Sequence, residues 1–352
     1  MAKVLIKPYL DKMHQLAASD LHLGTGAIPR LRVHGVLEPM GSNRLQFDHA
    51  VQMAREVLGP ETLKTLHLKK NLDFAFDEER NGYRQRYRGN AYVQKEGLSL
   101  VLRRIPINVP TLEQLNLPSH LGDFIRYHQG MLLITGPSGC GKTSTAAALI
   151  NMINDRRTDH IITLEDPVEY VFKNNKALIN QRQIGRDVDS YPTALKGALR
   201  QDPDVILVGE LRDLETTRLA VTAAETGHLV IGTLHTQSAA KTIYRLIDQF
   251  PPEQQAQIRT MMSETLRAVI TQQLIARADG RGRIPAVEVL VNTDSVANMI
   301  RDGKTYQLTN AIQTGRSQGM IAMDVYIQEL IDAGRVTKEE AISRGLLGPA
   351  KE

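Results

Sequence analysis

The sequence predicts an α/β protein of two domains, and three observations support this fold class. A glycine-rich phosphate-loop pattern lies between a short apolar run and a helix-forming stretch near residue 140. Residues 119–290 alternate apolar strands with helical periodicity, which is typical of a mostly parallel sheet covered by helices on both faces. The first hundred residues instead carry β-rich segments between turn signals, which predicts a small α+β domain with an antiparallel sheet. The predicted parts are 1–105 for the N-terminal domain, 106–118 for a linker, 119–290 for a P-loop core and 291–352 for a helical C-terminal region.

The composition is that of an ordinary globular protein and excludes several classes. The 352 residues are 42% hydrophobic and 23% charged, without an apolar run near the ~20 residues of a membrane span. A single cysteine, Cys140, excludes disulfides within the chain and zinc modules built on cysteine pairs. No secretory signal is visible, so we expect a cytoplasmic protein. The net charge of +4 comes with only 5% aromatic residues, which makes nucleic acid an unlikely partner.

The N-terminal region is predicted to contain two helices and several strands. Helical spacing covers residues 3–18 and 47–58, and the second helix should stop at Gly59-Pro60. The expected strands are 21–23, 28–36, 71–76, 83–93 and 98–104. Three prolines, at 106, 110 and 118, then restrict the backbone and predict a semi-rigid linker.

The second region is predicted to alternate between strands and helices before it becomes helical. We expect strands at 131–135, 160–164, 204–208 and 229–233, with helices after Lys142 and near 191–201, 215–226 and 239–246. From Pro252 onwards the spacing predicts helices over 258–275 and 294–302. A capping box at 337–340 predicts the start of a last short helix.

The stretch from Gly136 to Thr143, GPSGCGKT, matches the phosphate-loop pattern in full. Its glycines let backbone N–H groups turn around phosphate oxygens, and the following helix adds its positive N-terminal end. Lys142 is expected to reach the β and γ phosphates, and the Thr143 hydroxyl to bind Mg²⁺. The sequence therefore predicts a site for ATP and Mg²⁺. Its candidate binding residues are Gly136, Ser138, Gly139, Cys140, Gly141, Lys142, Thr143 and Ser144.

Three later strands bring polar side chains to the same edge of the predicted sheet. The strand 160–164 leads into Glu165, Asp166 and Glu169, and the strand 204–208 ends in Gly209 and Glu210. The strand 229–233 leads to His235, which is placed to sense a γ-phosphate. We expect these groups near the phosphate loop because ligands of open α/β sheets bind beyond the carboxyl ends of the strands. His228, just before the last of these strands, is a further candidate for that edge.

Four motifs together resemble the secretion ATPase superfamily, and within it the type IV pilus retraction motors. They are GPSGCGKT, TLEDPVEY, PDVILVGELRD and TGHLVIGTLHT, and the similarity extends to residues 19–23 near the start. The resemblance implies a PAS-like N-terminal domain and a RecA-like P-loop ATPase core with a helical C-terminal extension.

The resemblance also implies roles for single residues. Glu169 would act as general base on the attacking water, Glu210 would hold Mg²⁺ with Thr143, and His235 would monitor the γ-phosphate. Arg88 and Arg103 would close on the phosphates from the N-terminal domain, with the adjacent Arg104 as the alternative to Arg103. The implied protein is a homohexameric ATP hydrolase, peripheral to the inner membrane at the pilus base. It would act there on an inner-membrane pilus platform protein.

Three alternatives stay open at this point. Retraction motors carry the sequence AIRNLIR late in the chain, whereas residues 295–301 here read SVANMIR, so the first arginine is absent and an accessory retraction paralogue is an alternative. A RecA-like ATPase that depends on nucleic acid shares the phosphate loop. A nucleotide-gated scaffold without hydrolysis is the third. A pilus extension or type II secretion ATPase is disfavoured because it would add a four-cysteine zinc module.

Overall fold

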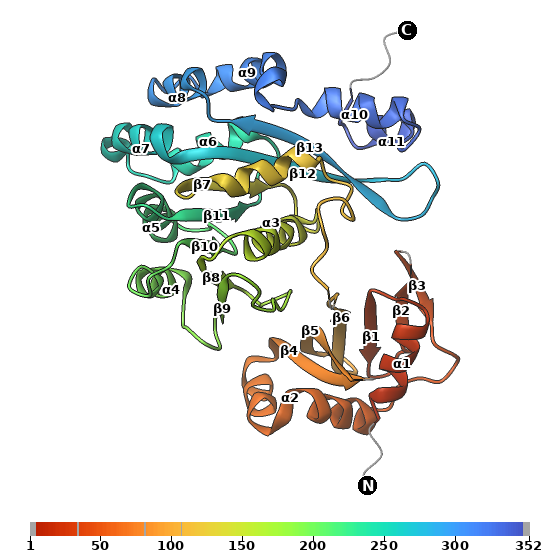
Figure 1. Ribbon diagram of the computed structural model, residues 1–352. Coiled ribbons are helices and arrows are strands. Elements are labelled where there is room, and N and C mark those ends of the chain that lie inside the picture. Colours follow the sequence, from red (N-terminus) through yellow and green to blue (C-terminus); the bar gives the residue numbers. More distant parts are fainter. Residues whose placement is uncertain (1–4, 34, 81, 107, 348–352) are drawn as a thin grey trace. The chain divides into compact units, whose positions relative to one another are not determined.

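The computed structural model describes residues 5–33, 35–80, 82–106 and 108–347 (Figure 1). The chain folds as two compact units, residues 1–108 and 109–352, and each is described by itself below. The predicted linker 106–118 spans the division between them. The finer boundary predicted at residue 290 stays a prediction. Among the described residues, no helix combines the length and the apolar character needed to span a bilayer.

The first unit is built on a six-stranded antiparallel sheet with the strand order β3-β2-β1-β6-β5-β4. Leu10 and Met13 of helix α1 and Met53 of helix α2 are buried in one core with Leu21 and Leu100 of the sheet. The elements are α1 (Lys7–Gln15), β1 (Asp20–Gly24), β2 (Arg30–Val33), β3 (Val36–Pro39), α2 (Phe47–Lys69), β4 (Asn71–Arg80), β5 (Tyr83–Gln94) and β6 (Gly97–Arg104).

Two predictions for the first unit need correction. The single strand expected over 28–36 is a hairpin, because the chain turns at Gly35, whose φ is 90°, and returns as β3. The helix expected to stop at Gly59 does lose helical backbone there, with φ 72° and ψ 170°. A second helical segment then follows as far as Lys69. Pro60 opens it, in the first turn, where a missing N–H costs nothing.

The second unit contains a seven-stranded sheet with the order β13-β12-β7-β11-β10-β8-β9, parallel except for β13. Its strands are β7 (Gly130–Thr135), β8 (His160–Glu165), β9 (Leu178–Gln183), β10 (Val205–Val208), β11 (Leu229–Leu234), β12 (Leu266–Ala276) and β13 (Arg283–Val291). The four strands expected before residue 235 are confirmed. Its α-helices are α3 (Lys142–Arg156), α4 (Tyr191–Ala198), α5 (Leu214–Glu225), α6 (Ala239–Asp248), α7 (Pro252–Thr265), α8 (Asp294–Arg301), α9 (Leu308–Thr314), α10 (Met323–Asp332) and α11 (Lys338–Ser343).

Helices cover both faces of this sheet, as the alternation of elements predicts (Figure 1). Met131 and Leu133 of β7 face a core that contains residues of α4 to α9. Leu132 and Ile134, the alternate positions, face a second core with α3 and the 3₁₀ helix Ser119–Arg126. Both faces of β7 are therefore dry, which explains its continuous apolar sequence.

The helix predicted over 258–275 is wrong in its second half. Helix α7 ends at Thr265, and the chain continues as the strands β12 and β13. Apolar residues at 258, 262, 266 and 270 keep helical spacing through the junction, so periodicity alone misses it. The β-branched run Val269-Ile270-Thr271 is fully buried and pairs with β7 in the centre of the sheet. The predicted helix start is confirmed, since the Thr337 hydroxyl accepts from the Glu340 N–H at the N-cap of α11, whereas the Glu340 carboxylate accepts from the Ala276 N–H and from Arg344.

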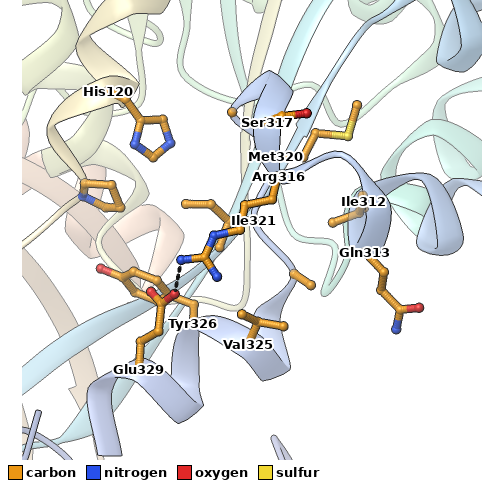
Figure 2. A pocket seen from close by; sticks show the side chains of 13 residues that line it. His120, Ile312, Gln313, Arg316, Ser317, Met320, Ile321, Val325, Tyr326 and Glu329 are labelled. Atoms are coloured by element: carbon orange, nitrogen blue, oxygen red, sulfur yellow. Dashed lines mark hydrogen bonds and ion pairs between the residues drawn. The ribbon is translucent and has the colours of Figure 1, made fainter. Parts of the chain in front are cut away.

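A cavity of about 620 Å³ lies between the start of the second unit and its C-terminal helices (Figure 2). Ile312, Met320 and Tyr326 give it apolar walls, and an exposed ion pair between Arg316 and Glu329 lies at its side. No residue of the phosphate loop lines it, so it is separate from the candidate site.

Candidate active site

The phosphate loop leaves the sheet at Thr135, the last residue of β7, and enters α3 at Lys142. Gly136 has φ 142°, and a Cβ there would lie 2.1 Å from the carbonyl oxygen of Gln272. Gly141, the residue before α3, has φ 93° and left-handed backbone. A side chain at Gly136 would displace the loop from β12, and one at Gly141 would strain it. These glycines are therefore required by the backbone itself.

Lys142 is folded back onto its own loop and is only 8% exposed. Its Nζ donates to the carbonyl oxygens of Gly136 and Pro137 over 2.9 and 3.1 Å. A third contact, of 3.3 Å, reaches Nδ1 of His235. Burial lowers the pKa of Lys142 from its usual value. The ammonium is held by neutral acceptors, so an anion placed in the loop would be a better partner.

His235 joins Lys142 to Glu210 in one chain of contacts. Its Nδ1 accepts from Lys142, and its Nε2 lies 3.3 Å from Oε1 of Glu210. This pattern fits a neutral imidazole with the proton on Nε2, an assignment inferred from the partners of the two ring nitrogens. Thus the predicted residues Lys142, His235 and Glu210 meet at the carboxyl edge of the sheet. The histidine is placed to respond when Lys142 changes partner.

Glu210 follows β10 after an intervening glycine, and the structure explains that glycine. A Cβ at Gly209 would lie 2.8 Å from the hydroxyl of Tyr191 and 2.9 Å from the carbonyl oxygen of Leu164. No side chain fits at position 209, so the carboxylate comes one residue later, at Glu210. Burial alone would raise the pKa of Glu210, but the ion pair with Arg212 at 2.7 Å and the contact with His235 hold it below its usual value.

The acids after β8 occupy two different environments. Glu165 is buried, accepting from Thr163 Oγ1 at 2.6 Å and from Gln181 Nε2 at 3.1 Å, and burial raises its pKa. Glu169 is half-buried, and its backbone N–H bonds the Glu165 carboxyl. Glu165 therefore has a structural role in shaping this turn, which leaves the exposed Asp166 and the half-buried Glu169 as the accessible acids.

Some of the remaining loop residues are buried or hydrogen-bonded to neighbouring segments, and others are exposed. Cys140 is buried and burial raises its pKa, so the thiol is kept in its unreactive form. The Ser144 hydroxyl lies 2.8 Å from the hydroxyl of Tyr170, which ties α3 to the segment after Glu169. Ser138 and Gly139 form the exposed tip of the loop, and Thr143 lies half-buried in the first turn of α3.

The candidate His228 lies away from the phosphate loop. His228 precedes β11 and therefore lies at the amino edge of the parallel strands, opposite the phosphate loop. Its Nδ1 contacts the carbonyl oxygen of Ala223 at 2.9 Å. The expectation that it faces the site is wrong, because parallel strands place their two ends at opposite edges.

Arg88 and Arg103 belong to the first unit and lie directly opposite each other on β5 and β6. Opposite residues of antiparallel strands share a face. Arg103 Nε also donates to Oδ1 of Asp20 over 2.8 Å. Asp20 is 4% exposed.

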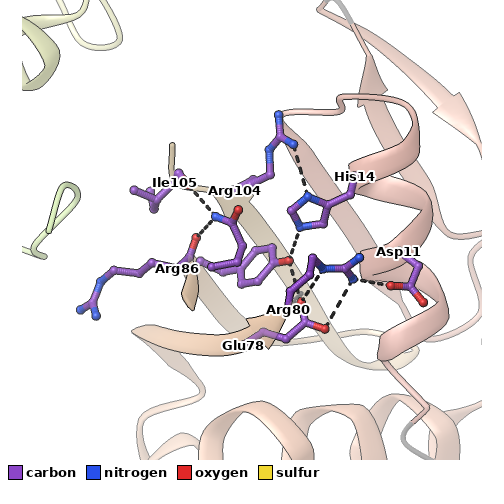
Figure 3. Close-up of polar contacts among 9 residues, drawn as sticks. Asp11, His14, Glu78, Arg80, Arg86, Arg104 and Ile105 are labelled. Atoms are coloured by element: carbon purple, nitrogen blue, oxygen red, sulfur yellow. Dashed lines mark hydrogen bonds and ion pairs between the residues drawn. The ribbon is translucent and has the colours of Figure 1, made fainter. Parts of the chain in front are cut away.

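Arg104 points to the other face and enters a polar cluster (Figure 3). Its Nη1 lies 3.4 Å from Nδ1 of His14, whose Nε2 lies 2.7 Å from the hydroxyl of Tyr87. Tyr87 donates in turn to Glu78, which pairs with Arg80. Arg103, rather than Arg104, is therefore the arginine that shares a surface with Arg88.

Sequence reasoning missed three residues that support this site: Arg212, Asp20 and Gln272. Arg212 lies two residues after Glu210 in the motif PDVILVGELRD, so its charge was an available signal. Asp20 reaches Arg103 only through the pairing of β1 with β6, which the sequence does not reveal. Gln272 lies in the stretch predicted as helix, so nothing in the sequence placed it near the loop.

Comparisons with known proteins show which family the chain belongs to. Residues 1–340 match the family described as Type II/IV secretion system protein. The type IV pilus retraction ATPase PilT of Pseudomonas aeruginosa is 43% identical over 324 residues, which cover 92% of this chain and 93% of that protein. The twitching motility protein of Neisseria gonorrhoeae is 42% identical over 316 residues, which cover 90% of this chain and 84% of that protein.

A solved structure is also similar along its whole length. The crystal structure of the pilus retraction motor PilT with bound ADP has a TM-score of 0.89 and 37% identity, and the match covers 99% of this chain and 98% of that one. The chain therefore belongs to the type II/IV secretion system protein family, as a nucleotide-binding ATPase with a RecA-like core.

Proposed function

We propose that this chain is a cytoplasmic motor that hydrolyses ATP to drive type IV pilus retraction. The observation that carries the proposal is the contact chain from Lys142 through His235 to Glu210, behind a phosphate loop with the required glycines. The similarity to PilT supports the choice of pilus retraction over other uses of ATP. The motor would work as a homohexamer at the inner face of the inner membrane, against the pilus platform protein.

Each candidate residue has one task in this proposal. Backbone N–H groups of the loop, from Gly136 to Ser144, would surround the phosphates, and Lys142 would exchange its carbonyl partners for phosphate oxygens. That exchange releases His235 Nδ1, so the histidine reports the nucleotide to Glu210. Glu169 would take the proton of the attacking water, as its place in the motif TLEDPVEY implies, and it is more accessible than the buried Glu165.

The protein groups expected to hold Mg²⁺ fit that ion. The Thr143 hydroxyl and the Glu210 carboxylate supply the hard oxygen ligands that Mg²⁺ prefers, and the lowered pKa of Glu210 keeps it ionised. Bound Mg²⁺ would neutralise charge on the transferred phosphoryl group.

The mechanical step would be closure of the two domains about the 106–118 linker. Arg88 and Arg103 supply positive charge that neutralises the phosphates only when the domains approach each other. A ligand shifts such an equilibrium by its differential contacts, so ATP would favour the closed state. Release of phosphate would remove those contacts and let the domains separate. Successive closures around a ring would move whatever the ring holds.

An accessory retraction ATPase is the second candidate, and one observation favours it. Position 297 on α8 is alanine where retraction motors carry the first arginine of AIRNLIR. Hydrolysis would then be intact while retraction would require a partner motor. ATP hydrolysis that depends on added DNA would instead indicate a nucleic-acid motor.

Phosphate release by the purified chain over a concentration series, with oligomer size measured in parallel, tests the proposal. We expect activity to rise as a hexamer forms, and Lys142→Ala and Glu169→Gln to abolish it. Lys176→Ala, an exposed lysine beyond β8, is the matched control and should leave activity unchanged. Nucleotide binding without phosphate release at any concentration would contradict the motor and support the scaffold.

A further inference from the structure

A glutamine from β12 is buried directly beneath the phosphate loop. Gln272 is 1% exposed, and its side chain makes two hydrogen bonds to the loop and to α3. Its Nε2 donates to the carbonyl oxygen of Cys140 over 2.7 Å, and its Oε1 accepts from Thr145 Oγ1 over 2.8 Å. Both hydrogen-bonding ends of the amide are therefore used, and both are used on the nucleotide-binding segment.

The backbone of the same residue also limits the loop. The carbonyl oxygen of Gln272 is so close to Gly136 that a Cβ there would lie 2.1 Å away, and Nε2 would lie 3.1 Å from a Cβ on Gly141. Gln272 thus lies against the first glycine of the loop and against the last one. Its strand is fixed in turn, because β12 pairs with β7 up to Thr271 and Thr135, whose hydroxyls lie 2.8 Å apart.

The bond to Cys140 sets the direction of one peptide group. In a trans peptide the C=O and the N–H point in opposite directions. Because Gln272 holds the Cys140 carbonyl oxygen toward β12, the N–H of Gly141 points away from β12. A phosphate cradle requires loop N–H groups that turn away from the sheet toward the anion, with their carbonyls on the outer side. The amide donor of Gln272 therefore favours the orientation that an anion needs.

We propose that Gln272 is a positioning residue for nucleotide binding, which holds the Cys140–Gly141 peptide in the orientation that receives phosphate. It touches the loop and not the reacting atoms, so it acts through the backbone. The inference rests on the proposed use of this loop for ATP and adds to it a residue that lies outside all four motifs. Without the amide donor, the Cys140 carbonyl would be buried without that partner, and the loop would lose a constraint on its binding conformation.

Affinity for ADP with Mg²⁺ tests the proposal in three variants. Gln272→Leu removes both bonds, and Gln272→Glu keeps an acceptor for Thr145 but loses the donor to Cys140. Gln273→Leu is the matched control, since the next residue along a strand faces the opposite side. We expect both Gln272 variants to weaken ADP binding by about ten- to a hundredfold, while Gln273→Leu binds like the wild type.

A pH series separates the lost donor from general damage. At neutral pH the carboxylate of Gln272→Glu cannot donate, whereas at pH 5 its protonated form regains an O–H donor. ADP affinity of Gln272→Glu, taken relative to the wild type at each pH, should therefore recover as pH falls, and Gln272→Leu should show no recovery. The unfolding midpoint without nucleotide, measured for all three variants, identifies a variant that fails to fold, and Gln272→Glu then carries the test.

The outcomes distinguish this inference from the proposed function. If the wild type and Gln273→Leu do not bind ADP, the nucleotide site itself is wrong. If they bind and both Gln272 variants bind equally well, only the positioning role is refuted. Weak binding by Gln272→Glu that stays the same fraction of wild type at every pH would also refute it, because the donor would then be irrelevant.

Discussion

Lys142 of the second unit and Arg103 of the first are both assigned to phosphate in the proposed mechanism, yet their surroundings differ. Lys142 is 8% exposed and bonded to neutral carbonyls, whereas the Arg103 side chain is 62% exposed and paired with the Asp20 carboxylate. Replacing carbonyl oxygens by a phosphate strengthens the bonds of a cation, whereas leaving a carboxylate breaks an ion pair. In the proposed mechanism, Lys142 therefore gains by binding nucleotide, whereas Arg103 stays paired with Asp20 until a stronger anion competes.

The largest effect should come from Lys142→Met. We expect phosphate release to fall by about a thousandfold, because the charge nearest the transferred phosphoryl group is lost. The free energy of unfolding should stay unchanged or rise by about 1 kcal/mol, since a buried ammonium without a carboxylate partner is removed. Phosphate-release assays and urea unfolding check the two expectations. A variant that loses both activity and stability would contradict this expectation, because Lys142 would then stabilise the folded chain as well as bind ATP.

The arginine side should give a smaller loss that depends on which face is changed. Arg88→Ala and Arg103→Ala should each reduce kcat by about a hundredfold, because each removes charge that stabilises the transition state. Arg104→Ala is the matched control, since Arg104 lies on the opposite face beside His14 and should retain most of the activity. Steady-state kinetics at a fixed oligomer concentration provide the measurement. An equal loss of kcat in all three variants would mean that the face of the sheet on which an arginine lies does not determine its effect on activity.

A double variant separates the two roles of Arg103. Arg103→Ala leaves Asp20, whose side chain is 6% exposed, with the Ser19 hydroxyl at 2.7 Å and Arg32 as its charged neighbour at 3.8 Å. We expect a loss of about 1 kcal/mol in the free energy of unfolding, because Arg103 is itself well solvated. Adding Asp20→Asn should restore that stability without restoring kcat. Recovery of activity together with stability would show that Arg103 only neutralises Asp20.

The phosphate loop was predictable from sequence. For the arginines of the first unit, the sequence supplied the candidates but not the face of the sheet on which each lies. Short motifs predict the loop and the first turn of α3. They also predict the strands that lead to Glu210 and His235, because each of these features depends on residues close together in sequence. Which of Arg103 and Arg104 shares a face with Arg88 depends on strand register, because neighbouring residues of a strand face opposite sides. The pairing of Arg88 with Arg103 settles which two share a face, and no short motif contains that information.

The least predictable part of the fold is the pair β12 and β13. Helical spacing continues from Ile258 through Leu266 into the strand, so the pattern favours a longer helix. Pairing with β7 overrides it, because the free energy gained there depends on a neighbour 136 residues away in sequence, from Thr135 to Thr271. Gln272 was missed for the same reason. Its function becomes visible only when the strand is placed beside the loop.

The polar cluster around Arg104 should give the smallest effect, and it depends on pH. Burial, helped by the charges of Arg80 and Arg104, lowers the pKa of His14, while Glu78 and Asp11 oppose the shift. The folded state therefore binds a proton on His14 less readily than the unfolded chain does, so stability is lost as pH falls below about 6.5.

His14→Gln should remove this part of the pH dependence. Between pH 7 and pH 5 we expect the wild type to lose more free energy of unfolding than the variant does. The difference should stay below about 1 kcal/mol, because the cluster is partly solvated. Urea unfolding of the two proteins across this range measures the difference, in which the other histidines cancel. A wild type that becomes more stable relative to His14→Gln at pH 5 would mean that protonated His14 pairs with Glu78.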